Sequence, residues 1–179
     1  MDERNLAQRA AQGDREAFGE LVRYHQAGVY NTAYRMLGER RDAEDAAQEA
    51  FLRAYRSIRS LDPSRPPGPW LRRIAVNVCL NRLEGREALL LDPEAPLAAA
   101  DPSPEAQSIA KERRGQIRQA LAGLPPRYRA AIELRHFQGL SYTEMAEALD
   151  RPLSDVKSDL FRARKLLAEK LKDLHAQTP

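Results

Sequence analysis

Residues 140–160 read LSYTEMAEALDRPLSDVKSDL, and this stretch decides the fold of the C-terminal part of the chain. Ser141 and Glu144 have the spacing of a capping box, which predicts that a short helix begins at Ser141. The helix is expected to stop at Asp150-Arg-Pro152, because proline cannot continue it. A long helix follows. A short helix, a turn of about four residues and a second helix together predict a helix-turn-helix, a motif that reads DNA with its second helix.

The second helix is expected to be capped by Ser154 and to run through Lys172. Its buried side is predicted from steps of four, three and four residues, as Val156, Leu160, Ala163 and Leu167. Basic and small polar side chains on the other side can reach phosphates and base edges in the major groove. The candidate DNA-binding residues are therefore Ser154, Lys157, Ser158, Asp159, Phe161, Arg162 and Lys165. An ordinary helical hairpin with a solvated basic face is the alternative.

Upstream of this motif, Gly and Pro divide the chain into further helical stretches, and no run has the alternation of a strand. Asp14 is predicted to cap a helix that ends at Gly38, and Asp42 to cap the next one. The two should pack as an antiparallel pair. Four prolines between Asp62 and Pro69 predict a loop there. A third helix is expected from near Trp70 to about Leu83.

Residues 88–104 contain four prolines, and five acidic residues without a Lys or Arg lie between Glu87 and Ser108. This composition is typical of an extended acidic linker. Beyond it, helices are predicted from about Ile109 to Leu121 and from Pro125-Pro126 to a stop before Gly139. The sequence therefore predicts an all-α fold with two small helical domains, residues 1–87 and 105–179, joined by a flexible linker at 88–104.

Composition excludes several classes of function. The 179 residues contain no apolar run of 18 residues and no signal peptide, so we expect a cytoplasmic protein without membrane insertion. One cysteine, Cys79, and three scattered histidines predict neither a disulfide nor a metal site, and Cys79 is interpreted as a core residue. No phosphate-binding glycine loop or nucleophile-base pair is present, so neither catalysis nor a cofactor is expected.

Taken in order, several segments resemble the sigma-70 family, and in particular its compact extracytoplasmic-function (ECF) group. The segments are Asp42-Ala-Glu-Asp-Ala-Ala-Gln-Glu-Ala-Phe-Leu-Arg-Ala-Tyr55, Trp70-Leu-Arg-Arg-Ile-Ala-Val-Asn77, Leu124-Pro-Pro through Leu140-Ser-Tyr-Thr-Glu-Met-Ala, Val156-Lys-Ser and Leu160-Phe-Arg-Ala-Arg164. The resemblance covers nearly all of residues 13–172 apart from the linker. It implies a sigma factor that binds core RNA polymerase, recognises promoter elements and starts transcription of a stress-response gene set.

Roles for individual residues follow from the same resemblance. Residues 1–87 would be region 2, which binds core polymerase and melts the −10 element, and residues 105–179 would be region 4, which reads the −35 element. The face formed by Asp45, Gln48, Glu49 and Leu52 would dock on the β′ clamp helices. The −10 contacts would come from Arg72, Arg73, Asn77, Asn81 and Arg82, with Asn77 holding a flipped base.

The resemblance also implies partners beyond promoter DNA and the clamp helices. These are the β flap of polymerase and an anti-sigma factor that covers both domains. The acidic linker would thread a positively lined polymerase channel, although a generic tether has the same composition. A stand-alone helix-turn-helix regulator acting without polymerase is the alternative function, but it leaves residues 14–86 unexplained.

The chain departs from the family in the recognition helix, where Ser154-Asp155 and Asp159 replace more usual residues. Asp159 is expected on the exposed side. There it would either accept from a cytosine N4 group or pair with Arg162 and orient that side chain. The usual −35 sequence is therefore not assumed.

Overall fold

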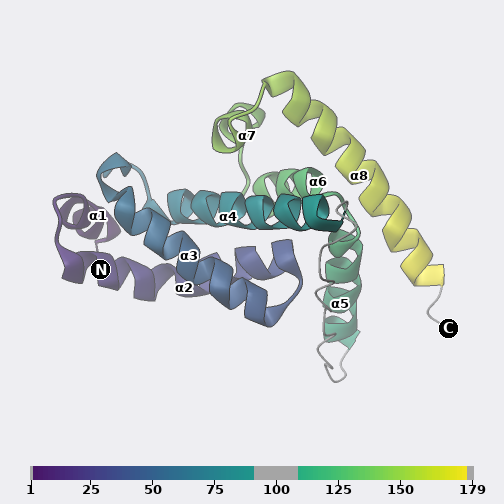
Figure 1. The fold of residues 1–179 in the computed structure, drawn as a ribbon, viewed down its shortest axis with the longest axis horizontal. Helices are drawn as coiled ribbons and strands as arrows, with labels where there is room; N and C mark the ends of the chain where they lie inside the picture. The colour runs from purple at the N-terminus through teal and green to yellow at the C-terminus, as the bar shows by residue number, and fades with distance from the viewer. Residues whose placement is uncertain (1, 91–108, 177–179) are drawn as a thin grey trace.

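The computed structural model describes residues 2–90 and 109–176, and within these ranges it contains helices and no strand. The all-α prediction is confirmed. The α-helices are α1 (Glu3–Ala11), α2 (Arg15–Leu37), α3 (Arg40–Arg56), α4 (Pro67–Leu90), α5 (Ile109–Ala122), α6 (Pro126–Ile132), α7 (Tyr142–Leu149) and α8 (Leu153–Ala176) (Figure 1). A 3-10 turn, η1 (Ile58–Ser60), follows α3, and a π-helical turn, η2 (Glu133–Phe137), continues α6.

Local capping signals set several of the boundaries as predicted. The Asp14 side chain accepts from the backbone N–H groups of Glu16 and Ala17, and α2 ends at Gly38, which has a φ of 81°. Ser141 and Glu144 form both hydrogen bonds of the capping box at the start of α7. The turn after α7 depends on Asp150, which adopts the left-handed conformation with a φ of 50°.

Three predicted helix starts are wrong, because the residue that was expected to cap or begin the helix lies inside it. Asp42 lies in the first turn of α3, which begins at Arg40 after Glu39. Ser154 is the second residue of α8 and does not precede it. Pro67 and Pro69 belong to the first turn of α4, where the missing N–H groups would have no helical partner in any case.

Two further differences concern the ends of the N-terminal half. Helix α1 was not predicted. Asp2 caps it, and it buries Leu6, Ala7 and Ala10 against α2 and η1. At the other end, α4 extends to Leu90, three residues into the predicted linker, and the remaining linker residues 91–104 lie outside the described part of the chain.

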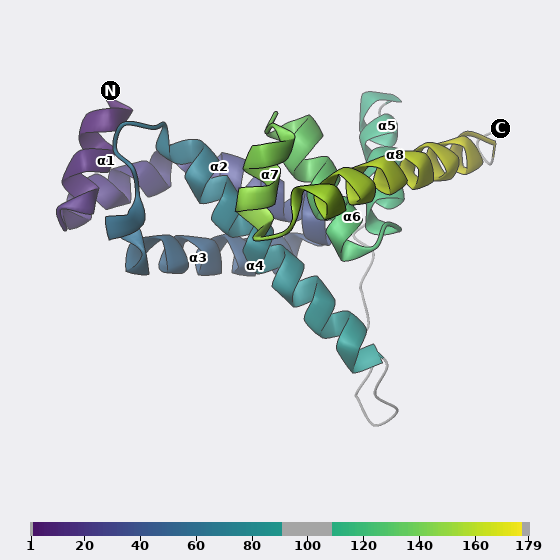
Figure 2. The same cartoon turned by 90° about the horizontal axis from the view of Figure 1, so that it is seen from above.

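One apolar cluster joins the two halves of the chain. Met36 from α2 and Val78 from α4 belong to the same buried cluster as Ile132 and Leu134 from the C-terminal half. Cys79 lies in this cluster with 0% of its surface exposed, as predicted, and burial raises the pKa of its thiol to about 12. In both views α6 lies beside α4 (Figures 1 and 2). The halves therefore pack against each other in this structure.

Candidate nucleic-acid interface

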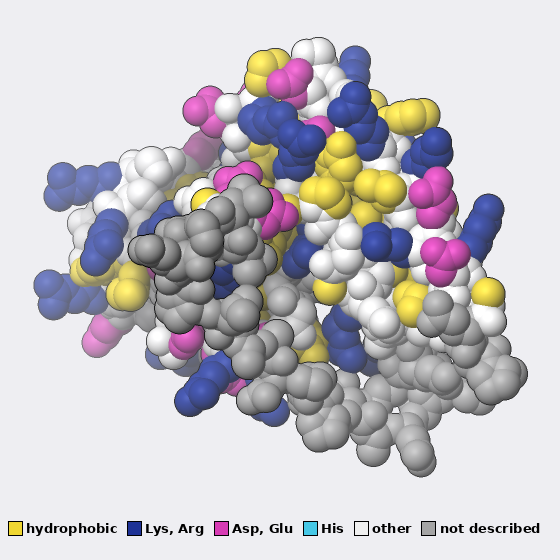
Figure 3. All heavy atoms as spheres, turned by 45° about the vertical axis from the view of Figure 1, so that its right-hand side comes forward, with side chains coloured by type: hydrophobic (Ala, Val, Ile, Leu, Met, Phe, Trp, Pro, Cys, Tyr) yellow, Lys and Arg dark blue, Asp and Glu magenta, His cyan; other side chains and the backbone are white. Residues whose placement is uncertain are grey.

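The exposed side of α8 carries the predicted DNA-binding set, with one exception. Lys157, Arg162 and Lys165 are exposed, Ser158 is half-buried, and Phe161 projects with 72% of its surface exposed. Val156, Leu160 and Ala163 are buried beneath them, as the spacing predicts, whereas Leu167 is only half-buried. Figure 3 turns the C-terminal helices forward and shows Lys and Arg side chains beside a gathering of hydrophobic ones. This side of α8 is cationic and accessible.

Asp159 is the exception, and the expectation that it is exposed is wrong. Only 5% of its surface is accessible, and its carboxylate accepts a short hydrogen bond from Arg151. Arg127 Nε lies 3.8 Å from Asp159 Oδ1. Because Asp159 is three residues after Val156 and four before Ala163, helical geometry places it on the buried stripe. Its charge holds the turn before α8 through Arg151, rather than orienting Arg162 or facing a base.

Arg73, Asn77 and Asn81 form a polar line along α4, and the first two of these residues face the C-terminal half. Asn77 Nδ2 donates to the backbone carbonyl of Ala148 in α7 at 3.0 Å, and Asn77 is half-buried. Arg73, one turn earlier, lines a cavity of about 480 Å³ with Gln138 and Glu144. Asn81, one turn later, is exposed. Two of the predicted −10 residues are therefore covered by the C-terminal half in this arrangement.

Arg72 is separated from this line and is half-buried near His25. Burial lowers the pKa of His25, and the Arg72 charge lowers it further, whereas the Glu3 carboxylate raises it. His25 also lies against Gly68, where an added Cβ would be 2.9 Å from the ring carbon Cε1. The beginning of α4 is thus packed tightly on α2.

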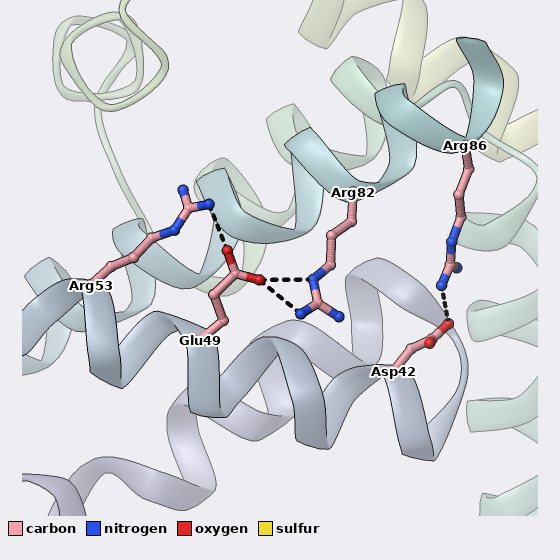
Figure 4. Close-up of polar contacts among 5 residues, drawn as sticks. All are labelled: Asp42, Glu49, Arg53, Arg82 and Arg86. Atoms are coloured by element: carbon pink, nitrogen blue, oxygen red, sulfur yellow. Dashed lines mark hydrogen bonds and ion pairs between the residues drawn. The ribbon is translucent and has the colours of Figure 1, made fainter. Parts of the chain in front are cut away.

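Arg82 points toward α3, away from the Asn77 line. Its Nε and Nη2 atoms lie 3.1 and 2.7 Å from Glu49 Oε2, and Arg86 Nη2 lies 2.7 Å from Asp42 Oδ2 (Figure 4). Arg53 donates to the other Glu49 oxygen at 2.5 Å. The structure therefore joins a predicted polymerase contact, Glu49, to a predicted DNA contact, Arg82. Sequence reasoning had assigned the two residues to separate sites.

The other predicted polymerase contacts lie together on α3. Asp45 and Gln48 are exposed, and Leu52 has 59% of its surface accessible although the adjoining stripe of alanines is buried. Glu49, in contrast, is half-buried because Arg82 and Arg53 flank it. This face of α3 therefore presents two exposed polar side chains and one exposed leucine.

A buried ion pair between the halves was missed by sequence reasoning. Arg35 of α2 donates from Nε and Nη2 to the two oxygens of Glu133, at 2.7 and 2.8 Å, and also lies over the Phe137 ring. Glu133 is only 2% exposed. The signal available in the sequence was the position of Glu133, a single carboxylate inside an apolar run that ends at Leu134. A buried charge of this kind needs a partner.

Arg129 forms a second polar link across the same boundary. Its guanidinium donates to the carbonyl of Met36, near the end of α2, and to the carbonyls of Ala122 and Leu124 at the end of α5. These are carbonyls for which no helical donor remains, so the cation satisfies two helix C-termini at once. Burial lowers the pKa of Arg129, although the side chain stays protonated.

Across residues 2–90 and 109–176, no group of three or more His, Cys, Asp or Glu side chains is arranged to hold a metal ion. Among the helices that the structure describes, none is long and apolar enough to cross a membrane.

Comparison with known proteins gives two family matches and many relatives. Residues 21–88 match the family described as sigma-70 region 2, and residues 114–167 match sigma-70, region 4. The ECF RNA polymerase sigma factor SigW of Bacillus subtilis (strain 168) is 36% identical, covering 90% of this chain and 92% of that protein. The ECF RNA polymerase sigma-E factor of Escherichia coli (strain K12) is 35% identical, covering 94% of each chain.

Solved structures give the same likeness. The chain is similar to CnrH, solved in complex with the cytosolic domain of CnrY, with a TM-score of 0.65, 26% identity and coverage of 96% of this chain and 97% of that one. The sigma factor RpoE from Bartonella quintana, solved with the anti-sigma factor NepR, has a TM-score of 0.66 at 23% identity, covering 87% and 96%, and supports the fold alone.

Proposed function

Because the chain belongs to the sigma-70 family, in its ECF group, we propose a division of its function among three surfaces. The protein is a sigma factor and initiates transcription with RNA polymerase. The α3 face of Asp45, Gln48, Glu49 and Leu52 binds the β′ clamp helices. Helix α4 contacts the −10 element, and the exposed side of α8 reads the −35 element.

The placement of these surfaces supports the division. The α3 face is exposed and mixes acidic, amide and apolar side chains, whereas the α8 face is cationic with an exposed aromatic ring. They belong to different halves of the chain, and each half matches a different sigma-70 region. Cations suit phosphate contact, and Phe161 suits contact with a thymine methyl group.

The contact of Asn77 with Ala148 adds a required step. While the Asn77 amide donates to that carbonyl, it is not available for a base, and α7 covers the approach. We therefore propose that α7 and α8 move away from α4 before the −10 element is bound. This opening exposes part of the shared apolar cluster, whereas Arg35, Glu133 and Arg129, which join α2 to η2 and α6, regain water only if those elements separate as well.

Partners and location follow as further parts of the proposal. The protein acts in the cytoplasm with polymerase and takes no catalytic step itself. The CnrH relative was solved with a protein bound to it. An anti-sigma factor that holds both halves would keep this chain closed in the same way that its own boundary contacts do.

Reconstitution with core polymerase tests the proposal. A randomised promoter library is transcribed by core polymerase with and without the full chain, and we expect selected promoter sequences to give transcripts only when the chain is present. A stand-alone regulator would instead bind duplex DNA without polymerase and yield no chain-dependent transcript. That result would reject the sigma-factor assignment.

A further inference from the structure

The carboxylate of Glu49 stands between two helices with different proposed partners. One oxygen, Oε1, accepts from Arg53 on its own helix, and the other, Oε2, accepts two N–H groups of Arg82 on α4 (Figure 4). The Glu49 and Arg82 side chains are 32% and 30% exposed, so their contact is partly shielded from water. Two guanidinium contacts also lower the pKa of Glu49, with the Arg82 hydrogen bonds the largest cause, so the group is charged at neutral pH.

A second pair continues the same connection between the helices. Asp42 Oδ2 and Arg86 Nη2 lie 2.7 Å apart. Asp42 is seven residues before Glu49 on α3, and Arg86 is four residues after Arg82 on α4. The two pairs therefore form a ladder between antiparallel helices, which Figure 4 shows from one side. Arg82 is held at a defined place along α4 instead of extending freely into solvent.

The two contacts of Glu49 differ in how easily they exchange. Arg53 is 45% exposed, lies four residues along the same helix and donates once to Glu49. Pairs of this kind contribute little to stability. Arg82 donates from two nitrogens to one oxygen, Glu49 Oε2, and it links separate helices, so its position depends on the packing of α3 against α4. A cation that approaches Glu49 from a docked protein can replace Arg53 and leave the Arg82 contact intact.

We infer that Glu49 is a positioning residue for Arg82, so that the α3 face which binds polymerase also sets the orientation of a DNA-contacting guanidinium on α4. This inference rests on the proposed function. It assigns to Glu49 a role beyond surface docking, because the same carboxylate binds polymerase and orients the arginine that contacts the promoter.

A double-mutant cycle in the holoenzyme tests the inference. Glu49→Gln, Arg82→Ala and the double variant are each assembled with core polymerase at concentrations that saturate binding for that variant. The substrate is a supercoiled promoter that the wild-type holoenzyme has selected from a randomised library. Permanganate reactivity of −10 thymines then reports melting without a contribution from core affinity.

Each single variant is expected to lower the rate of melting about fivefold, the effect of a partly shielded ion pair. The double variant should lose no more than Arg82→Ala alone, because Glu49 acts on melting only through Arg82. Arg53→Ala, which removes the other contact of Glu49, is the matched control and should melt at the wild-type rate. Arg82→Lys keeps the charge but not the paired N–H groups, and it should resemble Glu49→Gln.

Several outcomes would overturn the inference. If the two losses multiply to about 25-fold, Glu49 and Arg82 act independently. If Arg82→Ala melts the promoter at the wild-type rate, the guanidinium has no role to position. Thermal unfolding of each variant excludes a general loss of fold, and Arg82→Lys keeps the test valid if Glu49→Gln is unstable. The proposed function is judged separately, since it fails only if the wild-type protein gives no promoter-dependent transcript.

Discussion

Replacing Arg35 with Ala is expected to separate the two halves of the free protein. Arg35 is the only charged partner that the structure describes for Glu133 at hydrogen-bond distance, with contacts of 2.7 and 2.8 Å. Glu133 is 2% exposed. Without Arg35 a closed protein would contain an uncompensated buried carboxylate, whereas an open protein would return that carboxylate to water.

The size of the effect follows from the cost of an unpaired buried charge. Removal of one partner of a buried ion pair costs about 3–5 kcal/mol when the other partner stays buried. Arg35 is 26% exposed at its side chain, so we take the lower end of that range. A shift of about 3 kcal/mol changes the ratio of closed to open molecules by roughly two orders of magnitude.

Fluorescence energy transfer between labelled cysteines measures this ratio. Arg41→Cys on α3 and Glu169→Cys on α8 provide exposed attachment sites on the two halves. The natural Cys79 does not compete, because it is fully buried and its thiol has a pKa of about 12. We expect lower transfer efficiency in Arg35→Ala than in the otherwise identical protein with Arg35.

A charge exchange provides the control. Arg35→Glu and Glu133→Arg should each open the protein, and the double exchange should restore much of the transfer by re-forming the pair in reverse. If Arg35→Ala keeps wild-type transfer while its free energy of unfolding falls, the shared apolar cluster holds the halves together without the ion pair. The reasoning would then be refuted.

Four further predictions concern single sites. Asp45→Lys should weaken binding to core polymerase in a titration without lowering the melting temperature, because Asp45 is exposed. Asn77→Ala should impair melting of the −10 element by about 1–3 kcal/mol, seen as lost permanganate reactivity, while −35 duplex binding persists. Asp159→Ala should lower the free energy of unfolding by about 1–2 kcal/mol in urea, because Arg151 loses its hydrogen bond to the buried carboxylate but stays partly exposed and 3.6 Å from Asp155. An unchanged urea midpoint for Asp159→Ala would contradict that prediction. Cys79 should resist alkylation at pH 8, because a thiol whose pKa is about 12 stays protonated there; rapid labelling of the folded protein would show that it is accessible.

Much of the helical framework was predictable because its signals are local. The Asp14 cap, the stop at Gly38 and the Ser141–Glu144 capping box each depend on residues within one turn of one another. The helix-turn-helix followed from the same kind of signal. The exact starts of α3, α4 and α8 were not predictable in this way, because Asp42, Pro69 and Ser154 are each acceptable inside a first turn as well as before it.

Helix α1 and the boundary between the halves depend on long-range contacts. Leu6, Ala7 and Ala10 are too few to make a strong pattern, and α1 is fixed by packing on α2 and η1. The Arg35–Glu133 pair joins residues 98 positions apart. Hydrophobic periodicity carries no signal for a contact across that distance, so the closed arrangement could be found only in three dimensions.

The acidic residues show where sequence reasoning about a functional surface stops. Asp45 and Asp159 both lie on helices beside residues that the family resemblance marks as functional, and both were expected to face outward. Asp45 is exposed, whereas Asp159 is 5% exposed and bonded to Arg151. Helical spacing from Val156 and Ala163 places Asp159 on the buried stripe, but a carboxylate is expected to face water unless a cation can pair with it. For Asp159 the decisive fact is Arg151 in the preceding turn, which compensates the charge and makes burial possible. A carboxylate on a recognition helix therefore indicates DNA specificity only when no nearby arginine can bury it.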